Sequence, residues 1–182
     1  MPTSTVTCLF CNADAQELSP TGDARIVRCP GCLSYRLSGS AEQLLKNSPL
    51  DAQQQATASG WLREHPDTLI TTEIIEKLRN MGSPIPTAKS LKLLAYIQAQ
   101  TKTPGQTITL AYSDHAILSS AWLTSEPTEL AWHVEQALGL QGYITYMKLS
   151  DGSGFTCVIT LAGIKELQQS KRKSFGFRDG MN

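Results

Sequence analysis

The 182-residue sequence has no apolar run approaching the ~18 residues that a membrane-spanning helix needs. Its first ten residues, MPTSTVTCLF, also lack the basic region and the apolar core of a secretory signal. These two absences predict a cytoplasmic protein without a membrane partner, in a compartment that keeps thiols reduced. The hydrophobic content of 41% indicates a folded chain with a real core, built as one ordinary domain or two small ones.

Charge is scarce and balanced. Only 18% of the residues are charged, and 16 Lys and Arg stand against 16 Asp and Glu. The chain therefore lacks the overall positive charge that would by itself hold a phosphate backbone. Binding to nucleic acid would have to depend on a local basic patch.

The recognised catalytic motifs are missing as well. The sequence contains no P-loop, no G-x-G-x-x-G and no H-E-x-x-H. Of its three histidines, His115 directly follows Asp114, and neighbours on a helix point in different directions. His133 is expected to face solvent or an interface. Ser153 lies between two glycines but lacks the G-x-S-x-G spacing of a nucleophile turn. The sequence predicts a protein that is not an enzyme.

Four of the five cysteines form two C-x-x-C pairs separated by the 17 residues 12–28. The four are Cys8, Cys11, Cys29 and Cys32. This spacing is typical of a zinc site, because each pair forms a tight knuckle and two facing knuckles complete a tetrahedron of thiolates. Pro30 and Gly31 suit the turn of the second knuckle, and Asn12, which tolerates a left-handed backbone, follows the first.

Other chemistries of paired cysteines are disulfides, a redox pair, or iron in the same cage of four sulfurs. A reducing compartment and the lack of a thioredoxin-like context favour structural zinc. Four thiolates leave no open coordination position, so this zinc is expected to hold a fold and not to activate water. Cys157 lies in an apolar, strand-like run and is expected to be a small buried hydrophobe outside the site.

The first half of the chain is expected to hold two segments. Residues 1–39 read as a zinc ribbon with strands at 24–28 and 34–37 and a loop at 19–23, and its folding should depend on the metal. Residues 40–86 read as a helical connector. Its first helix is predicted at Ser40, with Gln43 completing a capping box, and its second at Ser48 and Pro49. A third helix is predicted over 72–80, and the proline-rich stretch 83–86 marks a boundary.

Residues 87–170 follow the order helix, strand, helix, helix, hairpin, helix. The hairpin is predicted from strands at 143–149 and 155–159 around a glycine-rich tip, and Thr160 is expected to cap the last helix. This order is that of a winged helix-turn-helix, and residues 171–182 form a basic tail. The predicted fold class is α+β, with an N-terminal four-cysteine zinc ribbon, a helical connector and a C-terminal winged helix-turn-helix.

The cysteine pairs, together with Trp61-Leu62-Arg63, Leu69-Ile70-Thr71 and Gly163, support a resemblance over most of the chain. The sequence resembles the zinc-ribbon plus winged-helix region that precedes TIR-like or nucleoside-deoxyribosyltransferase-like effector domains in bacterial proteins. Here residues 175–179 resemble a remnant of the strand that begins the effector domain, and the enzymatic part is expected to be missing, lost or on another polypeptide. The resemblance implies a recognition or regulatory module in antiviral or mobile-element biology, and it carries over no catalytic residue.

The distribution of charge bears on the partner. Residues 103–164 hold one base, Lys148, against five acids, a net charge of −4 that would repel nucleic acid. The leading hypothesis is therefore a non-enzymatic module that docks a protein partner, with Trp132 and Tyr146 as exposed aromatics. The alternative is a nucleic-acid-binding, transcriptional regulator that uses the ribbon, the winged helix and the basic tail. The candidate contact residues are Arg25, Arg28, Tyr35, Arg36, Lys171, Arg172 and Lys173. The sequence leaves the partner and the oligomeric state open.

Overall fold

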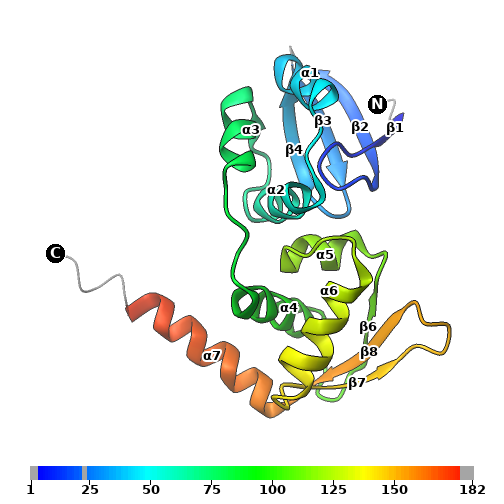
Figure 1. Ribbon diagram of the computed structural model, residues 1–182, viewed down its shortest axis with the longest axis vertical. Helices are drawn as coiled ribbons and strands as arrows, with labels where there is room; N and C mark the ends of the chain where they lie inside the picture. Colours follow the sequence, from blue (N-terminus) through cyan, green and yellow to red (C-terminus); the bar gives the residue numbers. More distant parts are fainter. Residues whose placement is uncertain (1–3, 22–23, 177–182) are drawn as a thin grey trace. The chain divides into compact units, whose positions relative to one another are not determined.

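A computed structural model describes residues 4–21 and 24–176, with side chains placed for 4–18 and 24–172. The fold is mixed α+β with two separate sheets. Contacts between Cα atoms divide the chain into two compact units (Figure 1). Unit 1 contains the described residues among 1–85 together with Ser113–Glu126, and unit 2 contains Pro86–Tyr112 and the described residues from Pro127 onward. Among the described residues, no helix combines the length and the apolar character needed to cross a membrane.

Unit 1 is built on a five-stranded sheet in which the strands lie side by side in chain order. The strands are β1 (Ser4–Thr7), β2 (Asp14–Thr21), β3 (Ala24–Cys29), β4 (Leu33–Ser38) and β5 (Leu69–Ile70). The first four pair in antiparallel fashion, and β5 joins β4 in parallel. The predicted strands 24–28 and 34–37 correspond to β3 and β4. The prediction missed β1, β2 and β5, and β2 runs into the stretch expected to be a loop.

The helices of unit 1 are α1 (Gly39–Asn47), α2 (Ala52–Glu64), α3 (Thr72–Arg79) and α5 (His115–Ala121). One face of the sheet is buried: Val27 alternates with exposed Arg28 on β3, as the two-residue period of a strand requires. Val27 belongs to the same core cluster as Leu45 of α1, Leu62 of α2 and Ile75 of α3, so these helices pack on that face.

Two helix starts differ from the prediction. The hydroxyl that caps α1 belongs to Ser38 and accepts a hydrogen bond from the Ala41 amide, because β4 leads directly into the helix. The capping box of α2 is formed by Asp51 and Gln54, since buried Leu50 keeps the chain outside the helix for longer. The cap of α3 is Thr71, and that helix lies close to its predicted range.

Unit 2 contains a three-stranded antiparallel sheet in the order β6-β8-β7. Its elements in chain order are α4 (Pro86–Gln100), β6 (Ile108–Ala111), α6 (Pro127–Trp132), the π-helical turn η1 (His133–Gly139), β7 (Ile144–Lys148), β8 (Gly154–Ile159) and α7 (Leu161–Gly176). As expected, the hydroxyl of Thr160 accepts a hydrogen bond from the Gly163 amide at the start of α7, at 3.2 Å. Residues 171–176 continue α7, whereas the sequence suggested a separate tail from 171.

The division into units differs from the segments expected from the sequence. The connector 40–86 shares one core with the sheet of unit 1, because Leu45, Leu62 and Ile75 pack against strand residues. Helix α5, expected inside the segment 87–170, belongs to unit 1. The chain thus leaves unit 2 after β6, adds α5 to unit 1, and returns to unit 2 at α6.

The expectation that His133 faces solvent is wrong. Its side chain is buried, with 2% exposed, and its Nδ1 lies 2.8 Å from the Ser90 hydroxyl of α4. The turn that starts at His133 is π-helical and changes which residues face the core. The prediction assumed the 3.6-residue period of an α-helix, which does not include this change.

Candidate metal centre

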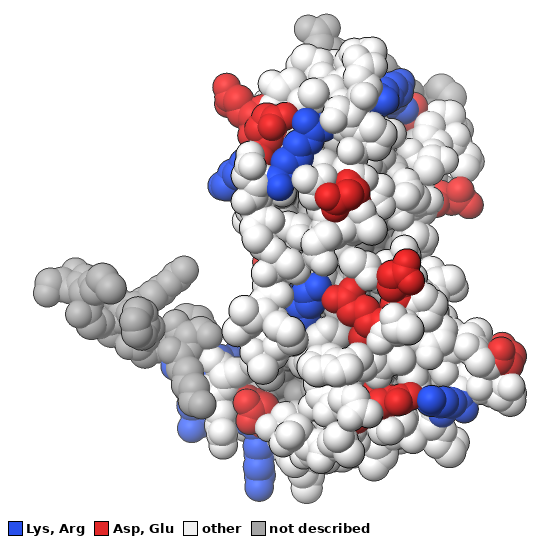
Figure 2. Space-filling view, viewed as in Figure 1, with Lys and Arg blue, Asp and Glu red and all other residues white. Residues whose placement is uncertain are grey.

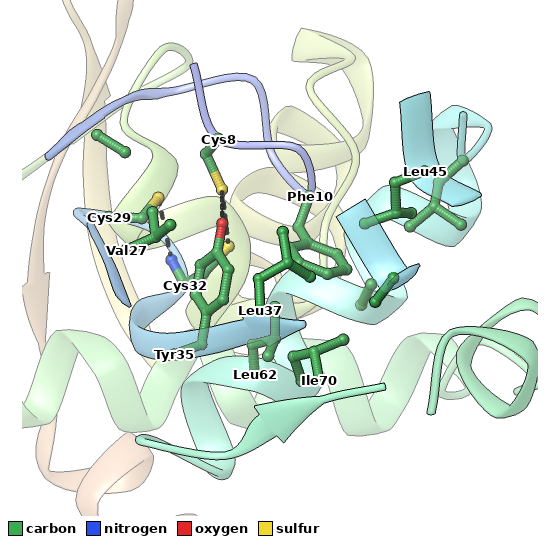
Figure 3. Close-up of a cluster of buried hydrophobic side chains, with 14 of the residues drawn as sticks. Cys8, Phe10, Val27, Cys29, Cys32, Tyr35, Leu37, Leu45, Leu62 and Ile70 are labelled. Atoms are coloured by element: carbon green, nitrogen blue, oxygen red, sulfur yellow. Dashed lines mark hydrogen bonds between the residues drawn. The ribbon is translucent and has the colours of Figure 1, made fainter. Parts of the chain in front are cut away.

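The four paired cysteines converge on one point of unit 1. Their sulfur atoms all lie within 4.8 Å of one another. Cys8 Sγ lies 3.7 Å from Cys32 Sγ, and Cys11 Sγ lies 3.3 Å from Cys29 Sγ, so each close pair contains one sulfur from each knuckle. Figure 3 shows Cys8 on one side of this cluster and Cys29 and Cys32 on the other. The structure therefore brings together all four residues that the sequence predicted as ligands.

Each knuckle lies at the turn of a hairpin. The first connects β1 with β2, next to the paired residues Thr7 and Asp14. The second connects β3 with β4, next to the paired residues Cys29 and Leu33. Because both hairpins belong to one sheet, their turns meet at the same end of it, and this registry brings the two cysteine pairs together.

The two knuckles share a backbone feature. The residue after the second cysteine is left-handed in both, Asn12 with φ 59° and Leu33 with φ 62°. This conformation lets the chain reverse, and in the second knuckle the Cys32 amide donates to Cys29 Sγ at 3.5 Å. Asparagine at position 12 agrees with the prediction. Leu33 gives no sequence signal, because leucine disfavours this conformation.

Two side chains outside the cysteine pairs support the centre. The hydroxyl of Tyr35 lies 3.3 Å from Cys8 Sγ, and Figure 3 shows it directed at that sulfur. Burial, reinforced by the neighbouring Cys8, raises the pKa of Tyr35, so the phenol keeps its proton and donates to the sulfur. Arg63 of α2 donates from Nη1 to the carbonyl oxygens of Pro30 and Gly31, at 3.1 and 2.8 Å. Sequence reasoning missed Arg63, because nothing in the sequence relates it to residues 33 positions earlier.

The thiols of the cluster share protons. Hydrogen bonds from Cys11 lower the pKa of Cys8 and of Cys29. The pKa of Cys11 is raised by its hydrogen bond with Cys29, and that of Cys32 by its hydrogen bond with Cys11. Four buried sulfurs this close cannot all ionise without a cation, whereas a bound cation replaces the shared protons. The arrangement therefore fits a thiophilic metal ion that uses four sulfur ligands.

Helix α5 packs directly on the second knuckle. A Cβ added to Gly31 would lie 2.8 Å from Ser119 Oγ and 3.1 Å from the carbonyl oxygen of His115, so these neighbours would have to shift to accommodate it. Glycine at position 31 therefore suits the close packing of α5 as well as the turn. The metal knuckle and α5 form one packed structure.

The structure separates the candidate contact residues of the sheet. Arg25 forms a two-pronged ion pair with Glu17, at 2.6 and 2.8 Å, and also binds Glu42, so its charge is used inside unit 1. Tyr35 is 1% exposed, and the expectation that it contacts a partner is wrong because its strand turns it into the core. Arg28 and Arg36 are exposed, and neither forms an ion pair with another described residue.

The remaining predicted residues lie in unit 2. Lys171 and Arg172 are exposed on α7, whereas the side chain of Lys173 lies outside the described residues. Cys157 is buried on β8, with its Sγ 3.6 Å from the Ile108 carbonyl oxygen, and burial raises its pKa to about 12. It lies outside the cysteine cluster, and an inert, protonated thiol at this position agrees with the sequence analysis.

The chain was compared with protein-family models, with curated proteins and with solved structures, and no match was found in any of the three comparisons.

Proposed function

We propose that the chain is a non-enzymatic recognition module of the cytoplasm in which structural zinc stabilises unit 1 and unit 2 docks a protein partner. Zinc is supported by the four sulfur donors and by their burial, since zinc takes four thiolates in closed structural sites. Iron uses the same donors, and metal analysis distinguishes the two. In this role Cys8, Cys11, Cys29 and Cys32 hold the ion, Tyr35 donates to a ligand sulfur, and Arg63 fixes the second knuckle.

A winged helix-turn-helix is supported by the order of elements from α4 to α7. Helix α4, strand β6 and helix α5 precede a third helix formed by α6 and η1, and the β7–β8 hairpin then takes the place of the wing. The departure from the usual arrangement is that α5 is packed in unit 1.

The observation that carries the proposal of a protein partner is the surface of the third helix. Its carboxylates are used inside unit 2: Glu129 Oε1 lies 2.7 Å from Lys89 Nζ, and Glu135 Oε1 lies 2.8 Å from Lys148 Nζ. Lys89 is 4% exposed, so that pair is internal. The negative charge that the sequence assigned to this helix is therefore largely neutralised.

The residues that the third helix exposes to solvent carry no charge. Trp132 is 48% exposed and Leu140 is 73% exposed, and the exposed Gln136 between them is uncharged. Exposed tryptophan is a frequent anchor in protein interfaces. The face in Figure 2 has acidic and basic side chains interspersed in a mostly uncharged surface, without the broad basic area typical of DNA-binding proteins.

Ser90 and His133 form a buried pair, and a serine paired with a histidine also occurs in nucleophilic catalysis. The hydroxyl of Ser90 donates its proton to the Pro86 carbonyl oxygen at 3.0 Å. Its oxygen therefore accepts a hydrogen bond from His133 Nδ1, and the histidine is not placed to remove the serine proton. Ser90 is 6% exposed and His133 is 2% exposed. These contacts favour a structural role in joining α4 to the third helix, and they support the proposal of a non-enzymatic protein.

The experiment is crosslinking with a photoreactive amino acid in place of Trp132, in extract of the native host. The matched control carries the same group at Met147, which is 72% exposed on the β7 strand and lies outside the third helix. A single protein crosslinked from position 132, and lost on competition with the unmodified chain, supports the proposal. Equal crosslinking from both positions, or none from position 132, overturns it.

Nucleic-acid binding is the second candidate, because Arg28 and Arg36 form an exposed pair on neighbouring strands. Ile26 is the cross-strand partner of Arg36, and Arg28 lies two residues further along β3 on the same face. Both guanidinium groups are available for phosphate. If this candidate holds, single-stranded or duplex probes bind at low salt, affinity falls steeply with added salt, and Arg28→Ala lowers the salt slope by about one. No binding at low salt removes it.

The biological setting, bacterial antiviral or mobile-element defence, is proposed on the sequence resemblance alone. In such a setting we expect the partner that unit 2 docks to carry an effector domain. The partner identified by crosslinking at Trp132 tests this directly, since it should then carry an enzymatic domain.

A further inference from the structure

A small cavity of about 100 Å³ opens beside the cysteine cluster, entirely within unit 1. Its walls are the first knuckle, α2, and α5 with the residues that follow it. No Asp, Glu, Lys or Arg side chain lines it. Its polar lining residues include His115 and also Asn12 and Gln55, whose amides hydrogen-bond to each other at 3.2 Å. A cavity of this size and character suits a small, uncharged molecule that forms hydrogen bonds.

The cavity reaches one of the four ligand cysteines selectively. Cys11 lines it and is the only one of the four that is not buried, whereas Cys8, Cys29 and Cys32 are between 0% and 5% exposed. Any small reagent from solvent therefore meets Cys11 first.

The hydroxyl of Ser119 also lines the cavity. Ser119 as a whole is buried, with 1% exposed. It lies near the ligand sulfur, because a Cβ on Gly31 would lie 2.8 Å from Ser119 Oγ and 3.2 Å from Cys11 Sγ. A ligand in the cavity can therefore take a hydrogen bond from this hydroxyl.

We propose that this cavity is a site of oxidative modification, in which hydrogen peroxide reaches Cys11 and converts Cys11 and Cys29 into a disulfide. The inference rests on the proposed metal centre, because a thiolate and not a thiol is the nucleophile, and coordination keeps Cys11 deprotonated. Hydrogen peroxide is small and uncharged, and it both donates and accepts hydrogen bonds. It therefore suits a small cavity lined by uncharged polar side chains. Ser119 is placed to donate to the peroxide oxygen that leaves.

The chemistry balances in two steps. The Cys11 thiolate attacks one peroxide oxygen, the O–O bond breaks, and the departing hydroxide takes a proton to become water, which leaves a sulfenic acid on Cys11. Cys29 Sγ, 3.3 Å from Cys11 Sγ, then attacks this sulfur and expels a second hydroxide, which also takes a proton. Overall, two thiolates, one hydrogen peroxide molecule and two protons are converted into one disulfide and two water molecules. A bound metal ion would keep only the two thiolates of Cys8 and Cys32, so we expect the disulfide to release it.

The test uses the full-length chain loaded with zinc and titrated with hydrogen peroxide. Peptide mass spectrometry identifies the first modified cysteine, with dimedone to trap sulfenic acid, and a chromogenic chelator follows zinc release. The expected first products are a dimedone adduct on Cys11 and a Cys11–Cys29 disulfide, with zinc released in step and recovered by reduction. Cys157 is an internal control, since its buried thiol should stay unmodified.

Two variants test the route through the cavity. Ala52 is exposed and lines the cavity, so Ala52→Leu should obstruct it and slow zinc release several-fold. Gln53→Leu is the matched control, because Gln53 is exposed on the same turn of α2 but does not line the cavity, and it should release zinc at the wild-type rate. Ser119→Ala should also slow release without weakening zinc binding.

The outcomes separate this inference from the metal centre itself. A chain that contains no zinc before peroxide is added overturns the metal centre and the inference together. A zinc-loaded chain in which Cys8 or Cys32 is modified first overturns only the inference. Zinc release from Ala52→Leu at the wild-type rate does the same.

Discussion

Gly60 of α2 faces the indole ring of Trp122, so closely that a Cβ on Gly60 would overlap the ring. Trp122 ends α5 in a left-handed conformation with φ 59°, is 7% exposed, and donates from Nε1 to Glu64 Oε1 at 3.0 Å. Two segments about 60 residues apart in sequence thus pack closely together, because position 60 has no side chain. This contact explains why α5 belongs to unit 1.

Gly60→Ala should destabilise unit 1, because the indole would have to move out of a packed position. Overpacking of this kind costs ~1–3 kcal/mol. Thermal unfolding measures the loss, and Trp122 fluorescence should shift as the ring becomes more exposed. Gly39→Ala is the control, since a Cβ at Gly39 would meet nothing within 4 Å. Equal stability of the two variants would refute this close packing.

Tyr35→Phe should weaken metal binding while the fold remains. The ring still fills the core, but the hydrogen bond to Cys8 Sγ is lost. Losing a hydrogen bond to a metal ligand typically lowers metal affinity roughly 10- to 100-fold. Competition with a chelator of known affinity measures the change. Tyr112→Phe, at a tyrosine of unit 2, controls for the removal of a hydroxyl, and a Tyr35→Phe protein with unchanged affinity would exclude the proposed role.

Cys29→Ser should lower the metal content below one ion per chain and loosen unit 1. A structural metal supplies folding free energy directly, so hydrogen exchange should increase in β3, β4 and α5. Elemental analysis and hydrogen exchange by mass spectrometry make the measurement. Cys157→Ala should retain its metal, because Cys157 is not in the cluster. Native protection in metal-free wild-type protein would argue against a structural ion.

Unit 2 should lose stability as the pH falls below about 6.5, the ordinary pKa of histidine. Burial lowers the pKa of His133, with Glu129 opposing and Lys89 reinforcing the shift. The folded state therefore binds a proton less readily than the unfolded state. This stability is complete above pH 6.5 and is lost as the pH falls toward the lowered value, by at most ~1.4 kcal/mol per pH unit.

His133→Gln should remove this part of the pH dependence. Chemical denaturation of both proteins between pH 7.5 and 5, followed by tryptophan fluorescence, gives this contribution as the difference between the two proteins. Protonation of the cysteines also weakens the metal centre in acid, but it affects both proteins equally. A His133→Gln protein with the same slope as wild type would show that His133 does not titrate in this range.

Local features of the structure were accessible from the sequence. The spacing of the cysteines predicted a cluster that the structure does contain. The helical periodicity of 72–80 located α3 within a residue or two, and the hairpin signals located β7 and β8. These signals depend on neighbours a few residues apart, which is why a single sequence contains them.

Features that depend on distant contacts were missed. The two-residue strand β5 exists only because it pairs with β4, and Arg63 reaches Pro30 only after α2 packs on the sheet. The place of α5 depends on Gly31 and Gly60, two glycines without side chains to signal a contact. The burial of His133 depends on a π-helical turn.

The sequence by itself determined the ligand set, since two C-x-x-C pairs bring four sulfurs together wherever their hairpins meet, and it determined most helix positions. Tertiary structure decided which polar side chains face inward. Tyr35 and Arg36 are adjacent on β4, and only the position of the helices makes the first a buried partner of Cys8 and leaves the second exposed. A strand specifies alternation between two faces, but the packing of other elements decides which face is the core.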